Sequence, residues 1–177
     1  IKITNTNNTN LNVYGGYTAG AGDSTNNHVT IAETSKVKNV YGGYVTAANA
    51  KAEGNSVTVE SGASLNDSIY GGWAKKTANN NTVTIAGGTF QKNIYGGYAT
   101  EASGTTENNI VNLGDDTHRD LSGATLSASD IYGGNKAATG NTLNVAAKNV
   151  TAKSVNNFEN YKFKLNSATA FGDTMLT

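Results

Sequence analysis

The sequence is marked first by the residues that it lacks. None of its 177 residues is cysteine or proline, and only Arg119 is arginine. Without cysteine the chain has neither disulfides nor zinc–thiolate sites. It also has no run of about 20 apolar residues, which a membrane-spanning helix requires. The 13 basic and 13 acidic residues balance, so neither nucleic acid nor an anionic membrane is expected as the main partner.

Asparagine, threonine and glycine are abundant instead. The chain contains 26 Asn, 24 Thr and 21 Gly, and 37% of its residues are hydrophobic. This hydrophobic content is thin for a conventional globule. We therefore expect backbone ladders and narrow apolar columns to hold the chain together, as in a secreted rod.

A six-residue phrase recurs five times. It reads NVYGGY twice, then SIYGGW, NIYGGY and DIYGGN. Its central tyrosines are Tyr14, Tyr41, Tyr70, Tyr95 and Tyr132. Self-similarity of this kind is typical of a solenoid, in which each unit buries its apolar edge against the next unit. The sequence therefore predicts a repeat protein.

A second phrase of alternating residues lies inside each period, as in Val29-Thr30-Ile31. An asparagine precedes it by two positions in every copy: Asn27, Asn55, Asn81, Asn109 and Asn141. Period-two alternation between Gly and Asn clusters favours short strands, and no window shows a helical apolar stripe. We therefore predict an all-β fold, a parallel β-helix (β-solenoid) of about five coils of 25–37 residues, over residues 1–153; right-handed winding is preferred, but the sequence does not fix it.

Stacking of coils assigns a direction to each repeated side chain. Equivalent strands in a parallel sheet lie about 4.8 Å apart, so like residues stack on like. The aliphatic positions of both phrases are expected to form inward columns, and the five central tyrosines an outward structural ladder. The five asparagines are expected to form a second structural ladder that bonds backbone and its own copies, although ligand binding is the alternative. We expect each Gly-Gly pair to make a corner with positive φ.

The final residue of the phrase forms a second aromatic set, Tyr17, Tyr44, Trp73 and Tyr98. These side chains are also expected to align from coil to coil. An exposed aromatic row can bind sugar faces or another protein, or it can simply cover the glycine backbone. Asn135 interrupts the row in the fifth coil.

The fourth turn is longer than its equivalents and contains Gly114-Asp115-Asp116-Thr117-His118-Arg119-Asp120. Its carboxylates, imidazole and guanidinium suit calcium binding or polysaccharide cleavage in principle. However, the equivalent turns of neighbouring coils supply no aligned acidic column. We therefore interpret residues 114–120 as a solvated loop, and predict no metal, no cofactor and no catalytic residue.

The periodicity ends after Val145, where Ser154-Val155-Asn156-Asn157-Phe158 loses the tyrosine and both glycines. Residues 154–177 are therefore predicted to be a terminal strand, a cap or a transition segment. The sequence opens in mid-strand at Ile1 and stops abruptly at Thr177. We therefore expect a fragment or a processed piece of a longer protein.

The Tyr-Gly-Gly repeats, with the closing segments 157–161 and 172–177, resemble the passenger regions of autotransporter (type V secretion) adhesins of Gram-negative bacteria. The resemblance implies export across the outer membrane and extracellular display on the cell surface. It implies a host or bacterial surface protein or glycan as partner, or further copies in a homo-oligomer or filament. Membrane contact is expected only through the family's β-barrel, which these residues do not include.

The first functional hypothesis is therefore a non-enzymatic bacterial adhesin or structural fibre segment that mediates cell–cell, host or self-association. One alternative is a self-assembling extracellular filament subunit. Another is a β-helical polysaccharide lyase or glycoside hydrolase, which requires two carboxylates converging on one groove.

Overall fold

The structure is a computed structural model that describes residues 1–137, 139–165, 169–170 and 172–177. Its regular elements are all strands, and the paired strands are parallel. They form a β-solenoid of about six turns, which confirms the predicted fold class. In the described part of the chain, no helix is long and apolar enough to cross a membrane. The direction of winding stays a prediction.

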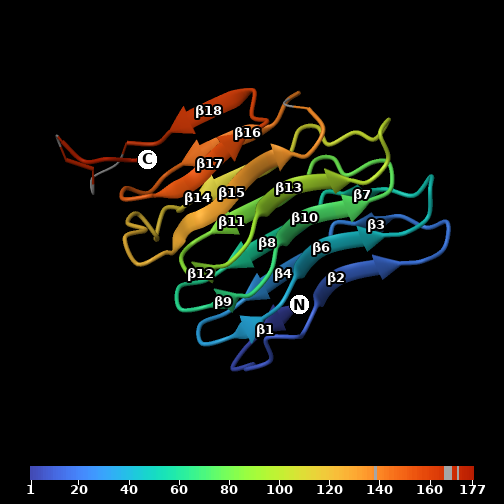
Figure 1. Cartoon of the computed structure of the whole chain (residues 1–177), viewed down its shortest axis with the longest axis horizontal. Helices are drawn as coiled ribbons and strands as arrows, with labels where there is room; N and C mark the ends of the chain where they lie inside the picture. The colour runs from blue at the N-terminus through green and yellow to red at the C-terminus, as the bar shows by residue number, and fades with distance from the viewer. Residues whose placement is uncertain (138, 166–168, 171) are drawn as a thin grey trace.

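The alternating phrase builds a seven-stranded sheet along one side of the solenoid (Figure 1). The register places Val57 beside Val83 and Val83 beside Val111. Identical phrases therefore pair without a shift. The sheet contains, in spatial order, β1 (Lys2–Ile3), β4 (His28–Ile31), β8 (Ser56–Val59), β11 (Thr82–Ile85), β14 (Ile110–Leu113), β16 (Thr142–Val145) and β18 (Asn160–Phe163).

The aromatic phrase builds a six-stranded sheet. Its strands are β2 (Val13–Thr18), β6 (Val40–Val45), β10 (Ile69–Ala74), β13 (Ile94–Ala99), β15 (Leu126–Gly134) and β17 (Ala152–Asn156). Two smaller sheets complete the coils: β5 (Lys36–Val37), β9 (Ser64–Leu65) and β12 (Thr89–Phe90) form one, and β3 (Ser24–Thr25) and β7 (Ala52–Glu53) the other. Figure 1 shows the coils following one another from the blue N-terminal end to the red C-terminal end.

The core consists of columns that run along the solenoid. Val40, Ile69, Ile94 and Ile131 are fully buried on the six-stranded side, with Val13 nearly so. The alternating phrase contributes Val29, Val57, Val83, Val111 and Leu143 together with Ile31, Val59, Ile85, Leu113 and Val145, all buried. A second, smaller cluster contains Val45, Ala50, Ala52, Ala74 and Ala78. Burial of stacked aliphatic side chains is thus the main apolar contribution to stability.

The prediction that each Gly-Gly pair makes a corner with positive φ is wrong. Each Gly-Gly pair lies inside a strand, and none of these glycines has a positive φ. Glycine is needed there for close approach, since a Cβ built on Gly43 would lie 2.4 Å from Nδ2 of Asn55. The two repeated phrases are therefore coupled, because the asparagine of one packs directly on the glycine of the other.

The corner with positive φ lies one residue before each ladder asparagine. It is occupied by Asn26, Gly54, Asn80, Asn108 and Gly140, with φ between 54° and 66°. Asparagine and glycine are the residues that adopt this left-handed conformation at the lowest cost. The asparagine clusters of the sequence therefore carry two roles, a corner residue followed by a ladder residue.

The stack continues past residue 153. β17 pairs with β15 and β18 pairs with β16, both in parallel. This continuation accounts for the sixth turn, and the separate role predicted for residues 154–177 stays a prediction. Tyr161 and Phe163 extend the buried columns of Leu143 and Val145, yet they remain 48% and 52% exposed. These two side chains are therefore much more exposed than Leu143 and Val145, with which they are in register.

Candidate binding surfaces

Two rows of aromatic side chains run across the six-stranded sheet. In the first row, the rings of Tyr14, Tyr41, Tyr70, Tyr95 and Tyr132 stack nearly parallel, with centroids 4.8–5.3 Å apart. In the second row, Tyr17 stacks on Tyr44 at 5.4 Å and Tyr44 stacks on Trp73 at 4.4 Å. Tyr98 completes this row and contacts Tyr95 edge-on at 5.1 Å. Offset stacked and edge-to-face contacts are the favourable geometries for aromatic pairs.

Both rows project from the same face of the sheet, although their members lie three residues apart in the chain. Side chains of a regular strand alternate, so residues 14 and 17 would otherwise point to opposite faces. The rings of Tyr14 and Tyr17 nevertheless meet edge-on at 5.5 Å. The Cα pairing of β2 with β6 includes Tyr14 and Gly16 but omits Gly15. The alternation therefore shifts at the glycine pair, and this shift creates the double row.

Stacking decides which parts of these rings a partner can reach. Ring faces within a row are covered by their neighbours, so the surface consists mainly of ring edges and hydroxyl groups. Tyr17 is 59% exposed, while Tyr44, Trp73 and Tyr98 are half-buried. Burial raises the pKa of Tyr41, and it raises the pKa of Tyr70 to about 12. The side chains of the second row thus partly cover the first row, and they are themselves accessible to a partner.

The fifth coil ends the second row with Asn135. Its Nδ2 donates to the Ala99 carbonyl at 2.9 Å, and its Oδ1 accepts from the Ala99 backbone N–H at 2.8 Å. The amide therefore pairs with backbone where the other coils present a ring. The two-row surface accordingly extends from β2 to β13.

The five ladder asparagines lie in one column at the start of the alternating strands. Each Oδ1 from Asn55 to Asn141 accepts both the backbone N–H and the Nδ2 of the preceding asparagine, at 2.8–3.3 Å. The Nδ2 groups of Asn55 and Asn81 also donate to the carbonyls of Ser24 and Ala52. From Asn55 onward the side chains are buried. These asparagines therefore connect neighbouring coils and present no accessible surface to a ligand.

The loop over residues 114–120 is organised around Asp115. Its Oδ1 accepts from the Thr117 hydroxyl and from the backbone N–H groups of Thr117 and His118, each at 2.7 Å. Burial opposes ionisation of Asp115, but these hydrogen bonds outweigh it and hold its pKa at about 2. The Asp115 carboxylate therefore stabilises the loop in which it lies.

The other carboxylates of this loop have separate partners. Asp116 pairs with Lys164, and Asp120 accepts from Asn149 Nδ2 and the Ser122 N–H. Within the described ranges, no group of three or more His, Cys, Asp or Glu side chains lies close enough to hold a metal ion. Each of the three carboxylates of the loop is thus held by a different set of partners.

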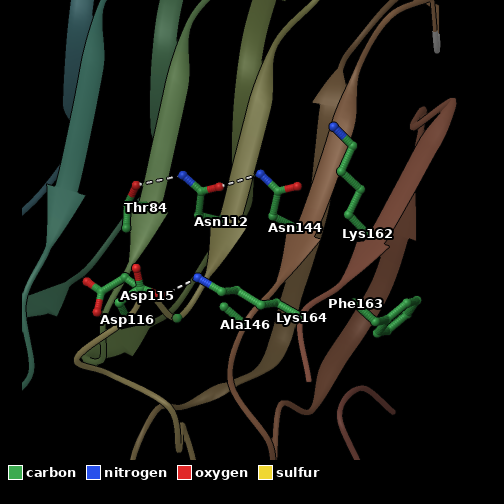
Figure 2. Close-up of a pocket in the computed structure, with 10 residues that line it drawn as sticks. Thr84, Asn112, Asp115, Asp116, Asn144, Ala146, Lys162, Phe163 and Lys164 are labelled. Atoms are coloured by element: carbon green, nitrogen blue, oxygen red, sulfur yellow. Dashed lines mark hydrogen bonds and ion pairs between the residues drawn. The ribbon is translucent and has the colours of Figure 1, made fainter. Parts of the chain in front are cut away.

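A cavity of about 490 Å³ lies beside this loop on the outer face of the seven-stranded sheet (Figure 2). Thr84, Asn112 and Asn144 form one side in a hydrogen-bonded row. Asp116 and Lys164 form another side through their ion pair. Lys162 stands next to Asn144 in the register of the sheet.

Small residues at one repeated position create this cavity. The position directly after the alternating phrase is Glu60 in β8's coil and Lys164 in β18's coil, but it is Ala86, Gly114 and Ala146 between them. Three successive coils thus lack a long side chain there. This cavity was not predicted from the sequence, although the small residues at one repeated position are a signal for a hollow there.

Comparison with protein-family models, with curated proteins and with solved structures finds no match to this chain.

Proposed function

We propose that this chain is a non-enzymatic segment of a bacterial cell-surface adhesin or fibre, displayed outside a Gram-negative cell in the manner of an autotransporter passenger. The observation that carries the proposal is the double aromatic row on a rigid stack of coils. It offers a partner an ordered surface of ring edges and hydroxyl groups across four strands. Aromatic side chains with a polar tip are enriched in protein interfaces because they combine apolar area with a hydrogen-bonding group.

The partner proposed for this surface is a protein or glycan on a host or bacterial cell. Two features support an adhesive role over a purely structural one. Rings buried for stability alone would not need accessible hydroxyl groups, and the second row keeps Tyr17 largely exposed. The strands beneath the rows pair in exact register, so the surface is preorganised and loses little entropy on binding.

Binding of the purified chain to intact bacterial and epithelial cells tests this proposal. We expect Tyr17→Ser and Tyr44→Ser to reduce cell binding, because they remove the exposed Tyr17 ring and the half-buried ring that stacks on it. Leu165→Ser is the control, since it removes an exposed apolar side chain outside both aromatic rows. Circular dichroism must show that each variant keeps its fold. Unchanged binding by folded Tyr17→Ser and Tyr44→Ser variants would refute an adhesive role for this surface.

A self-assembling filament is the second candidate, and the exposed apolar side chains of β18 favour it. Tyr161 and Phe163 lie in register with the core residues Leu143 and Val145 and are about half exposed, and among the described strands β18 pairs with β16 alone. Unpaired strand edges are templates for addition of another chain. Electron microscopy of the purified chain should show end-to-end fibres, and Phe163→Lys should prevent them. Isolated short particles at high concentration would rule this candidate out.

A further inference from the structure

We propose that the cavity beside the 114–120 loop is a binding site for an acidic sugar, meaning a saccharide unit that carries one carboxylate. The proposal deepens the adhesive function by naming a ligand class and a second site, and it rests on that function only for its biological role. Three features of the cavity carry it: an unpaired cation, a row of amides and an apolar floor. Figure 2 shows their arrangement.

Among the residues that the structure describes, the charges of the cavity leave one cation available, Lys162. Asp116 is paired with Lys164, and Asp115 is held by Thr117 and His118 within its own loop. Lys162 is exposed, and it forms no hydrogen bond or ion pair with any residue that the structure describes. Its ammonium group therefore can pair with a carboxylate of a ligand without breaking an existing ion pair, and charge-assisted hydrogen bonds are the stronger ones.

The amide row provides both donors and acceptors beside that cation. Asn112 Nδ2 donates to Thr84 Oγ1 at 3.0 Å, and Asn144 Nδ2 donates to Asn112 Oδ1 at 2.7 Å. Each amide nitrogen has two N–H groups, so each keeps one for a ligand. The row runs in one direction, which leaves Asn144 Oδ1 as an acceptor at the end next to Lys162. Sugar hydroxyl groups donate and accept at once, and they match this combination.

The floor of the cavity is apolar and small. Gly114 and Ala146 line it, so the C–H face of a sugar ring can lie against them without desolvating a polar group. Phe163 points away from the amide row (Figure 2), as expected for the residue between Lys162 and Lys164 on an alternating strand. The volume of about 490 Å³ falls within the roughly 300–1,000 Å³ of typical ligand sites. The cavity is therefore large enough to hold a sugar ring.

The test is an NMR titration of the purified chain with three probes: methyl glucuronide, methyl glucoside and acetate. We expect methyl glucuronide to shift the backbone amide signals of residues 112–116, 144 and 162–164, and to bind more tightly than the other two. Lys162→Gln should weaken glucuronide binding about tenfold, because it removes one charge-assisted hydrogen bond. The same variant should leave binding of methyl glucoside unchanged. Lys92→Gln, at an exposed lysine outside the cavity, is the matched control and should bind like the parent.

Two results would overturn the proposal. Equal binding of acetate and methyl glucuronide would show a site for charge without recognition of a sugar. If a folded Lys162→Gln variant binds glucuronide with full affinity, Lys162 does not pair with the carboxylate of the sugar. The sugar site and the adhesive function can fail separately, because they are tested on different residues. If Tyr44→Ser loses cell binding but still binds glucuronide, adhesion is assigned to the aromatic rows alone.

Discussion

Substitution of Asn81 by alanine tests whether the asparagine column holds the coils together. The Asn81 side chain is fully buried and makes four hydrogen bonds. Its Oδ1 accepts the backbone N–H of Asn55 at 3.0 Å. After Asn81→Ala this buried N–H has no acceptor, whereas Asn55 Nδ2 keeps its bond to the Ser24 carbonyl.

The expected cost follows from these contacts. An orphaned buried donor costs about 1–3 kcal/mol, and each further lost hydrogen bond contributes about 1 kcal/mol net. We therefore expect Asn81→Ala, which orphans one donor and loses three further bonds, to lower the free energy of unfolding by about 4–6 kcal/mol. Asn27→Ala should cost about 1 kcal/mol, because Asn27 is only half-buried and none of the described residues donates to its Oδ1.

The assay is urea unfolding followed by circular dichroism and by the fluorescence of Trp73, the only tryptophan. Coincident transitions by both probes establish two-state behaviour and justify the comparison of free energies. Asn66→Ala is the matched control, since this exposed asparagine keeps its backbone bond to the Val37 carbonyl; it should change stability by less than about 0.5 kcal/mol. A loss for Asn81→Ala as small as that of the control would refute the role of the column.

Three further predictions concern glycine packing, alkaline pH and the long loop. Gly72→Ala should destabilise the fold by about 1–3 kcal/mol, because its Cβ would lie 2.4 Å from Asn81 Nδ2. Thermal unfolding measures this loss. Gly20→Ala is the control and should unfold like the parent, because a Cβ at Gly20 meets nothing within 4 Å. Burial raises the pKa of Tyr70 from 10.0 to about 12, so its contribution to stability is complete below pH 10 and is lost as the pH rises through 12. The difference in phenolate absorbance between the parent and Tyr70→Phe measures this titration, and a midpoint near pH 10 would contradict it. The pKa of Asp115 is lowered from 3.8 to about 2, so the loop should stay ordered above pH 3.8 and loosen only as the pH falls through about 2; NMR signals of Thr117 and His118 that already change at pH 4 would be evidence against this.

Much of the fold was predictable because the repeat is nearly exact. Equal phrases at near-equal spacing pair with their own copies, as Tyr70 does with Tyr95 and Val83 with Val111. The positions of the two aromatic sets and of the asparagines follow from that pairing. The role of the Gly-Gly pair did not follow, because positive φ and close packing both select glycine, and only the contact between Gly43 and Asn55 distinguishes them.

The candidate sites divide in the same way. Alignment of Tyr17 with Tyr44 was visible in the sequence, but their position beside Tyr14 on one face was not, since it depends on a shift of alternation inside the strand. The cavity was only partly visible, because the small residues at positions 86, 114 and 146 signal a hollow but do not show what closes it. It requires Lys164 to reach Asp116, which lies 48 residues earlier in the chain.

The sequence by itself determined that this protein is a stack of parallel coils with apolar columns inside, because a regular repeat of short alternating strands has one efficient way to bury its aliphatic side chains. Only the tertiary structure decided which surfaces are available to a partner. A hollow or a double row depends on the sizes and directions of side chains from different coils, and these meet only after the coils have stacked.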